Sequence, residues 1–516
     1  MTAAAGYITD VTYVPGFYAH MAPVALRHVA ALNRVAPPRV AEGFRYLELG
    51  CGLGRSLTTL AAANPHGQFV GIDVNAEHTA AVERDVAAGG LRNVRVINAA
   101  FDAAPADLGS FDFIALHGIW SWVSPQVRED VLRVLDRHLA PGGLVLVSYN
   151  ALPGWAHLQP IRGILRHYAA LRQGDSVQRI KDALAYVVYI RDKHAKYFED
   201  NPRAAAYVDA LLTQDAKYLA HEYLNEHWTS FYVADVAAAF GAAGLPFVGS
   251  LPVHTNFWDL CVRPEFQELF RTTTNRLVTE AHKDFCANTA FRWDIFSRQP
   301  RTLADVEARL READDLHFRV ARPGTTLPWQ ANLGVVTSTV QGPLYQALLD
   351  ALGDRSLRLS EIVAAEPFRA TRPDDVARAV DAGVAMGLFE VAAGPLPDVT
   401  GNVTGRVSVP DAFNRALIAS EALGGRAIAL ASRHTGTGHS IGDLEAVMLH
   451  ELCERGRDGV ADRVSARLAT SGRTLQQQGR AVTDATEQAQ LVAQACDTFL
   501  TTSVPALARL GIVATG

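Results

Sequence analysis

The chain has 516 residues, of which 49% are hydrophobic and 20% are charged, and its formal net charge is −6. Because a single hydrophobic core stops growing at about 250–300 residues, this length predicts two or three domains. The composition is typical of globular proteins and excludes collagen-like, low-complexity and disordered classes. Proteins that mainly bind phosphate backbones are usually basic, so we expect no nucleic-acid partner.

The cysteines and the first residues indicate a reducing compartment. The N-terminus, MTAAAGYITD, has neither the basic nor the apolar region of a signal peptide, and no run of about 18 apolar residues follows it. We therefore expect a cytoplasmic protein with no membrane partner. The five cysteines are odd in number and widely spaced, which disfavours a disulfide framework and a zinc ribbon: Cys51, Cys261, Cys286, Cys453 and Cys496.

Residues 45–150 alternate between short apolar runs and amphipathic stretches. The amphipathic stretches predict helices near 55–63, 76–88 and 125–140, the last of which begins at a proline and ends before PGG. Nearly continuous apolar strands that alternate with helices predict an α/β fold, a parallel sheet with helices on both faces. The predicted strands are RYLELGCG (45–52), QFVGIDV (68–74), NVRVINAAF (93–101), FDFIALHG (111–118) and LVLVSYN (144–150).

After residue 150 the pattern changes to helices, and two further strands follow. Residues 158–229 are almost wholly helical in pattern, and YVADVAAAFGAAG (232–244) predicts one more helix. The runs LPFVGSL (245–251) and FWDLCVR (257–263) have the composition of strands and are close enough to pair as an antiparallel hairpin. A helical insertion at about 172–230 is therefore predicted to interrupt the sheet before its last two strands.

The C-terminal half predicts two further regions. Residues 343–395 have the pattern of three short helices followed by LFEVAAG, an order that resembles a winged-helix module, and residues 396–516 are mainly helical. The expected recognition helix at 373–387 carries three aspartates against one arginine. Because an acidic face repels phosphate, we expect this module to pack or to bind protein rather than DNA.

The strongest chemical signal is the segment ELGCGLG, which runs from Glu48 to Gly54 between a predicted strand and a predicted helix. Its glycines allow a sharp turn and a close approach to a ligand, and the helix N-terminus favours an anionic group. The dinucleotide fingerprint requires glycine where this chain has Arg55, and no Walker A lysine is present. Glu48 would repel a phosphate but suits a ligand that carries an ammonium group.

This E-x-G-x-G-x-G segment resembles motif I of class I S-adenosylmethionine-dependent methyltransferases. Asp73 ends the second strand about 20 residues after Gly52, where related folds place a ribose-binding carboxylate, and Phe101 and Asp102 follow the third strand. The resemblance implies a Rossmann-like seven-stranded sheet whose last two strands are antiparallel, S-adenosylmethionine as cofactor and S-adenosylhomocysteine as product. The cofactor-binding residues that it implies are Tyr13, Glu48, Gly50, Cys51, Gly52, Gly54, Asp73, Val74, Phe101, Asp102, His117 and Trp120.

Longer segments resemble a narrower family, the bacterial methyltransferases that carry a methyltransferase regulatory domain and include rickettsial protein-lysine methyltransferases. These segments are PPRV (37–40), HGIWSWVSP (117–125), SYNALPGW (148–155), YLAHEYLNEHWTSFYVADV (218–236) and KDFCANTAFRWDIF (283–296). The resemblance implies a protein substrate, although family members differ in their targets. The expected regions are an N-terminal segment over the cofactor (1–40), the methyltransferase domain (41–265), a winged-helix-like regulatory region (266–395) and a helical C-terminal domain (396–516).

Methyl transfer requires little of the protein beyond positioning and desolvation. A lysine acceptor must first lose a proton, since its reference pKa is about 10.4. Ligands of α/β sheets bind beyond the carboxyl ends of the strands, so the candidate catalytic residues are His117 after the fourth strand and Tyr149 after the fifth. Trp120 and Trp122 are candidates for the wall of the acceptor channel, with core packing as the alternative.

The segment HEYLNEHW (221–228) has two histidines but does not predict a metal site. The zincin pattern requires a histidine at the position of Asn225, and histidines six residues apart lie on different helix faces. We interpret this segment as a helix at the substrate entrance, where Glu222 or Glu226 attracts a cationic side chain. The alternative is a structural cluster of hydrogen bonds.

The predicted function is methyl transfer to lysine amines of a protein. One alternative is a methyltransferase for a small molecule or a biosynthetic peptide, with the insertion as a lid over a compact pocket. Another is a regulatory protein that binds S-adenosylmethionine without turnover.

Tyr13, in the segment TYVPGFYAHMAP (12–23), would fold over the cofactor or anchor a surface helix.

Overall fold

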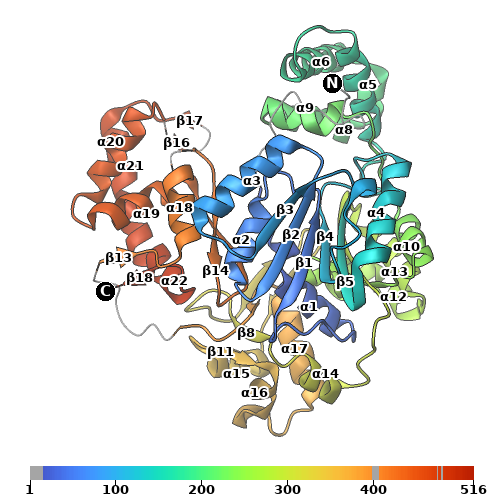
Figure 1. Cartoon of the computed structure of the whole chain (residues 1–516), viewed down its shortest axis with the longest axis vertical. Helices are drawn as coiled ribbons and strands as arrows, with labels where there is room; N and C mark the ends of the chain where they lie inside the picture. Colours follow the sequence, from blue (N-terminus) through green and yellow to red (C-terminus); the bar gives the residue numbers. More distant parts are fainter. Residues whose placement is uncertain (1–15, 398–405, 423, 474, 478–479, 516) are drawn as a thin grey trace.

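A computed structural model describes residues 16–397, 406–422, 424–473, 475–477 and 480–515. A seven-stranded sheet with the order β3-β2-β1-β4-β5-β7-β6 lies at the centre, with helices on both faces (Figure 1). β1 to β5 are parallel, whereas β7 is antiparallel to β5 and β6. The strands are β1 (Phe44–Leu49), β2 (Gly67–Asp73), β3 (Val94–Asn98), β4 (Phe111–Leu116), β5 (Leu139–Asn150), β6 (Phe247–Leu251) and β7 (Phe291–Ser297).

The helices predicted between the strands are confirmed as α2 (Arg55–Ala63), α3 (Ala76–Gly89) and α4 (Pro125–His138). The first turn of α4 begins at Pro125, and the Ser124 hydroxyl caps it by accepting a hydrogen bond from the Val127 amide at 3.2 Å. Central strand residues such as Leu47, Ile114 and Val145 are fully buried, as expected of a parallel sheet that is covered on both faces.

The last strand of the sheet differs from the prediction. The run at 257–263 contains the short helix α11 (Trp258–Cys261), and Phe291–Ser297 instead forms β7 between β5 and β6. The physical reason is burial: Ile295 and Phe296 of β7 are fully buried in the main cores, whereas Cys261 and Val262 pack in a small separate cluster. The sheet therefore extends to Ser297, past the expected boundary at residue 265.

Helices fill the chain between β6 and β7. These elements are η3 (Val253–Asn256), α11, η4 (Pro264–Phe266), α12 (Gln267–Thr272) and α13 (Arg276–Ala287). A buried network of charges ties this segment to the sheet: Arg292 of β7 donates hydrogen bonds to Glu280 and Asp284 of α13 and to Asp294 of its own strand.

A helical insertion follows β5, as predicted. It has its own hydrophobic core, which includes Ile161, Val187 and Leu219. The chain returns to the sheet through α10 (Val233–Ala242). The inserted helices are α5 (Gln159–Ala170), α6 (Ser176–Asp192), α7 (Lys196–Asp200), α8 (Pro202–Leu212) and α9 (Ala216–Leu224).

The region after β7 contains a small sheet with the order β11-β8-β12 and a separate β9–β10 pair. The three helices and the following strand expected in residues 343–395 are present; their description as a winged helix stays a prediction. The elements are α14 (Val306–Glu312), β8 (His317–Val320), β9 (Trp329–Asn332), β10 (Thr337–Val340), α15 (Pro343–Leu352), β11 (Ser356–Arg358), α16 (Leu359–Ala364), η5 (Glu366–Phe368), α17 (Pro373–Ala385) and β12 (Phe389–Ala392).

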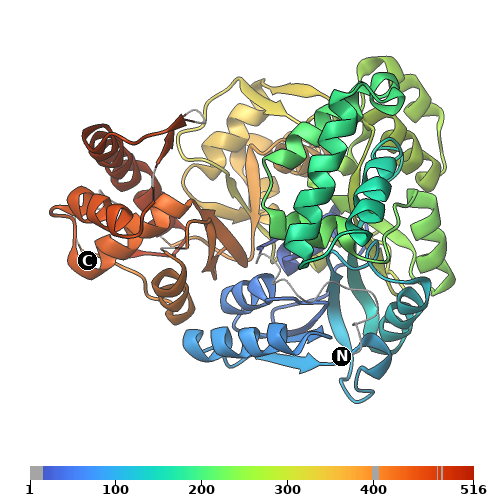
Figure 2. The same cartoon turned by 90° about the horizontal axis from the view of Figure 1, so that it is seen from above.

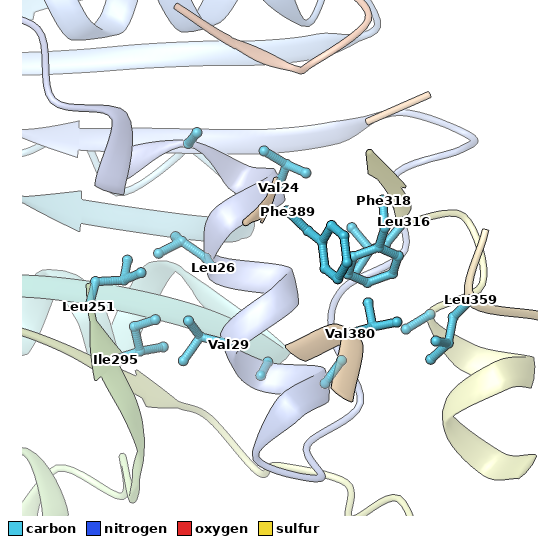
Figure 3. Packing of buried hydrophobic residues seen from close by; sticks show 14 of the residues in the cluster. Val24, Leu26, Val29, Leu251, Ile295, Leu316, Phe318, Leu359, Val380 and Phe389 are labelled. Carbon is cyan, nitrogen blue, oxygen red and sulfur yellow. The ribbon is translucent and has the colours of Figure 1, made fainter. Parts of the chain in front are cut away.

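The N-terminal helix α1 (Pro23–Leu32), which follows η1 (Ala19–Met21), joins this region to the central sheet. Figure 3 shows the apolar side chains of α1 between residues of the two sheets, all in one continuous core. On one side lie Leu251 and Ile295, and on the other lie Phe318, Val380 and Phe389. The two regions therefore share a core and are not independent packing units.

The C-terminal region is mainly helical, as predicted, and packs on α2 and α3. Figure 2 shows it on the opposite side of the molecule from the helical insertion. Arg55, at the start of α2, lies 2.8 Å from Glu421 of this region. Its elements are β13 (Val407–Ser408), α18 (Ala412–Glu421), β14 (Ile428–Ser432), β15 (Thr437–Ile441), α19 (Asp443–Arg455), α20 (Val460–Thr470), β16 (Gln476–Gln477), β17 (Arg480–Ala481), α21 (Ala485–Thr498), η6 (Phe499–Ser503), α22 (Val504–Arg509) and β18 (Ala514–Thr515).

Among the helices of the described ranges, none has the length and hydropathy that a membrane span requires.

Candidate active site

A cavity of about 690 Å³ lies where the glycine-rich turn and the carboxyl ends of the parallel strands meet the helical insertion. This is the edge of the sheet at which α/β folds bind their ligands. The turn and the ends of β1, β2 and β4 form one wall, and α9 together with the start of β7 forms the opposite wall.

The glycine-rich turn has a left-handed backbone at all three of its glycines, Gly50, Gly52 and Gly54, a conformation that favours glycine. At Gly50, where φ is 72°, an added Cβ would lie 2.1 Å from Ile119 Cδ1. At Gly52, where φ is 52°, the added atom would meet open space, and the amide donates a hydrogen bond to Asp73 Oδ2 at 2.8 Å. The turn therefore exposes bare backbone to the cavity and holds Asp73 in place.

Glu48 lies at the base of this turn and is only 6% exposed. Its Oε2 atom is buried and accepts no hydrogen bond from any residue that the structure describes. Burial, together with the nearby Asp73 carboxylate, raises the pKa of Glu48 to about 8. Because an unpartnered buried carboxyl is costly, a cationic group in the cavity would stabilise its ionised form.

Residues after β2 and β3 form a third part of the wall. The Asp73 carboxylate also accepts a hydrogen bond from the Asn75 amide at 2.9 Å. Val74 is half exposed, and Phe101 and Asp102 begin η2 (Phe101–Ala103); all three line the cavity. The arrangement provides apolar surface beside carboxylates, which suits a flat heterocycle with polar substituents.

His117 lies after β4 within a stack of rings. Its ring stacks on Trp293 at 4.3 Å with an interplanar angle of 8°, and the Tyr18 ring lies 3.8 Å away on a tilt. Its Nδ1 is 2.7 Å from the Ser148 hydroxyl. Burial and the nearby His20 lower the pKa of His117 to about 3, so the imidazole is neutral at physiological pH.

Two predicted site residues lie away from the cavity. Tyr149 is 1% exposed and donates a hydrogen bond to Asp294 Oδ2 at 2.5 Å, because alternate residues of β5 point to opposite faces and it is Asn150 that lines the cavity. Trp120 is 3% exposed and packs in the core against Phe240, with ring centroids 5.1 Å apart. Neither Tyr149 nor Trp120 is among the residues that line the cavity, and their roles in catalysis and cofactor binding stay predictions.

Tyr13 lies outside the described residues. Tyr18 of the same N-terminal segment covers the cavity, and its amide donates a hydrogen bond to the Ser56 hydroxyl at 3.0 Å. The other residues predicted to bind the cofactor all line the cavity: Glu48, Gly50, Cys51, Gly52, Gly54, Asp73, Val74, Phe101, Asp102 and His117.

The wall opposite the glycine turn comes mainly from one face of α9. Its lining residues follow the spacing of a helix face and are Tyr218, His221, Glu222 and Asn225. His227 is not among the lining residues, and the described parts of the chain contain no group of three His, Cys, Asp or Glu side chains able to hold a metal ion.

Several lining residues were not singled out from the sequence. Trp155 and Phe291 form apolar wall near α9, and Ser56 and His78 lie near the glycine turn. The aromatic run FRWDIFS (291–297) has the composition of a strand and is a usable signal for Phe291, although the prediction places the last strand at 257–263. Ser56 and His78 have no local signal, since their place depends on tertiary packing.

Comparisons with known proteins agree with this geometry. Residues 47–143 match the family model described as a methyltransferase domain, and residues 215–298 match a predicted methyltransferase regulatory domain. An uncharacterized protein of Synechocystis sp. is 29% identical over 514 residues, which are 99% of this chain and 100% of that protein. An uncharacterized protein of Rickettsia prowazekii is 28% identical over 291 residues, which are 55% of this chain and 51% of that protein.

The fold is shared along the whole chain with a solved structure. The structure of PKMT2 from Rickettsia typhi in complex with AdoHcy matches with a TM-score of 0.71 and 19% identity, over 97% of this chain and 99% of that chain. The glycine-rich turn, the strand order with an antiparallel β7 and the two family models agree with one another. The chain therefore contains an S-adenosylmethionine-dependent methyltransferase domain and a methyltransferase regulatory domain, on a fold that it shares with PKMT2.

Proposed function

We propose that the chain transfers methyl groups from S-adenosylmethionine to lysine side chains of a protein substrate. The observation that carries this proposal is the wall of the cavity beyond the glycine turn. There, Glu222 forms a hydrogen bond with Tyr218, and Trp155 and Phe291 line the same cavity. A carboxyl among aromatic rings suits an ammonium group at the end of a flexible apolar stem, which is the chemistry of a lysine side chain.

The glycine-turn end of the cavity fits the cofactor. Glu48, whose buried oxygen has no partner among the described residues, would face the ammonium group of its methionine part. Asp73 would bind the ribose hydroxyls, and Phe101 and Asp102 would contact the adenine. S-adenosylmethionine, when bound, supplies a methyl group on a positively charged sulfur.

The chain contributes positioning and exclusion of water. Tyr18, His117 and Trp293 form a cluster of rings, of which Tyr18 and His117 line the cavity. His117 lines the cavity as predicted, but its lowered pKa of about 3 makes it a poor proton acceptor at physiological pH. We therefore assign His117 to positioning: with Nδ1 engaged by Ser148, it holds the rings in one arrangement.

The resemblance to rickettsial protein-lysine methyltransferases and the fold shared with PKMT2 support a protein substrate. The test is to incubate the purified chain with methyl-labelled cofactor and a bacterial lysate, and to locate the label by mass spectrometry. We expect label on lysine residues of proteins, and less label with Asp73→Ala at a cofactor concentration near the dissociation constant of the wild-type chain. Label that reaches only small molecules would refute the protein substrate and favour a small-molecule methyltransferase.

A further inference from the structure

Glu222 occupies a different part of the fold from the other acidic residues of the cavity. It lies on α9, across the cavity from the glycine turn and Glu48. Tyr18 lies within electrostatic range of both carboxyls: burial raises the pKa of its phenol, and Glu222 and Glu48 both add to this effect. The cavity thus has the carboxyls of Glu48, Asp73 and Asp102 at the proposed cofactor end and that of Glu222 at the proposed acceptor end, with the Tyr18 phenol near Glu48 and Glu222.

Glu222 also differs from acidic residues that serve the fold. Glu280, which is fully buried, contacts Arg276, Lys283 and Arg292 within 3.0 Å, and these cations lower the pKa of Glu280 to about 2. Burial instead raises the pKa of Glu222 to about 7. Glu222 is half-buried on the cavity wall, and in the described residues it forms no ion pair like those that hold Glu280.

The groups that face Glu222 do not neutralise it. The Tyr218 hydroxyl forms a hydrogen bond with Glu222, and Arg162 favours its ionised form without reversing the effect of burial. One nitrogen of the Arg162 guanidinium donates a hydrogen bond to the Asn225 carbonyl at 2.5 Å and the group lies 5.2 Å over the Trp228 ring, while its Nε has no partner among the described residues. The titratable and charged groups within range are Tyr18, Arg162 of α5, Tyr207 of α8, and Tyr218 and Tyr223 of α9.

From this arrangement we propose that Glu222 is a catalytic residue that receives the ammonium group of the acceptor and removes its proton. The inference rests on the proposed transfer to lysine amines. One N–H bond of the ammonium breaks and its proton moves to a carboxylate oxygen of Glu222, which leaves the lone pair on nitrogen. The nitrogen then forms a bond to the methyl carbon as the carbon–sulfur bond of the cofactor breaks, with its electron pair left on sulfur.

The chemistry of Glu222 suits this step. General bases are most effective when their pKa lies near the working pH, and the raised pKa of Glu222 meets this condition. The apolar rings around Glu222 disfavour the ammonium form of a lysine. They therefore lower the pKa of the acceptor amine from its reference value of about 10.4 toward the pKa of Glu222. The segment matched by the regulatory-domain model, 215–298, therefore supplies the proton acceptor for a reaction whose cofactor site lies in the methyltransferase domain.

The first test measures binding without turnover. A short peptide with one lysine, and the same peptide with norleucine in its place, are titrated into the S-adenosylhomocysteine-bound chain by calorimetry. Glu222→Gln should weaken binding of the lysine peptide about tenfold or more and leave the norleucine peptide unchanged, as expected for loss of a charge-assisted hydrogen bond. Glu199→Gln, an exposed change on α7 of the same insertion and away from the cavity lining, is the matched control and should alter neither.

The second test is the pH profile of kcat/KM on the lysine peptide. For the wild-type chain kcat/KM should rise through about pH 7, and in Glu222→Gln that limb should disappear and kcat should fall about 10²- to 10⁴-fold. Unchanged affinity for S-adenosylhomocysteine shows that the variant is folded. Identical pH profiles in the two enzymes would overturn this inference alone. No transfer to any lysine by a wild-type chain that binds cofactor would overturn the proposed function, and this inference with it.

Discussion

Cofactor binding should release a proton from Glu48. This carboxyl is buried, its Oε2 has no partner among the described residues, and its pKa is raised to about 8 by burial and by Asp73. A raised carboxyl pKa means that the neutral form dominates below pH 8. If Glu48 faces the ammonium group of the cofactor, the bound state requires the carboxylate, so affinity must rise as pH rises toward 8.

The size of this effect follows from the pKa of Glu48. With a pKa of about 8, about half of the Glu48 side chains are ionised at pH 8 and only about one in a hundred at pH 6. The α-amino group of S-adenosylhomocysteine stays mainly protonated over this range, because it is the amine of a free amino acid beside a carboxylate. The ionisation of Glu48 therefore predicts affinity about 50-fold higher at pH 8 than at pH 6, or about 2.3 kcal/mol.

The assay is calorimetric titration with S-adenosylhomocysteine at pH 6, 7 and 8, in buffers that differ in heat of ionisation. At pH 7 the wild-type chain should release close to one proton for each ligand bound. Glu48→Gln should abolish this release and weaken binding at pH 8 by about 1.5–3 kcal/mol, while Glu83→Gln on the exposed face of α3 should behave as wild type. An affinity that does not change between pH 6 and pH 8, or an equal slope in Glu48→Gln, would refute the assignment of Glu48.

Four other changes test the site and the fold. Asp73→Ala should weaken S-adenosylhomocysteine binding by about 1–3 kcal/mol in calorimetry, because charge-assisted hydrogen bonds to the ligand and the contact to the Gly52 amide are lost; unchanged affinity would contradict this role. Tyr149→Phe should leave methyl transfer unchanged and lower the unfolding midpoint, since Tyr149 donates only to buried Asp294. NMR of labelled histidine should show no titration of His117 between pH 5 and 8, because its pKa is lowered to about 3. Asp381→Asn should lower the free energy of unfolding, measured with urea, by about 3–5 kcal/mol, because Arg309 stays buried without its anionic partner. Asp374→Asn, an exposed change on the same helix, should have little effect.

The cofactor end of the site could be predicted because its signals are local. The glycines of the turn, Asp73 at the end of β2 and Phe101 after β3 each occupy a fixed place relative to their own strand. The carboxyl ends of parallel strands meet at one edge of a sheet, so these positions converge without knowledge of the rest of the fold. The structure brings them to one cavity, as the sequence predicts.

Side-chain direction at the ends of β4 and β5 could not be predicted with the same success. A shift of one residue moves a side chain to the opposite face of a strand, and nothing local distinguishes Tyr149 from Asn150 as the residue that faces the cavity. Tertiary packing decides which of the two residues faces the cavity: β7 places the Asp294 carboxylate where it accepts a hydrogen bond from the Tyr149 hydroxyl. The same holds after β4, where Trp120 packs against Phe240 of α10 while Trp122 lines the cavity.

The predicted position of the last strand was also wrong, and the observed position of β7 shapes the acceptor side of the site. A strand directly after β6 would have formed a local hairpin at the edge of the sheet, but β7 arrives from about 40 residues further along the chain and pairs with both β5 and β6. Phe291 thereby reaches the cavity and Trp293 stacks on His117. The methyltransferase-domain match ends at residue 143, before β7 and α9, which lie within the regulatory-domain match. Residues 215–298 therefore complete both the central sheet and the wall around the proposed acceptor, and they cannot be removed as a separable regulatory unit without opening the site.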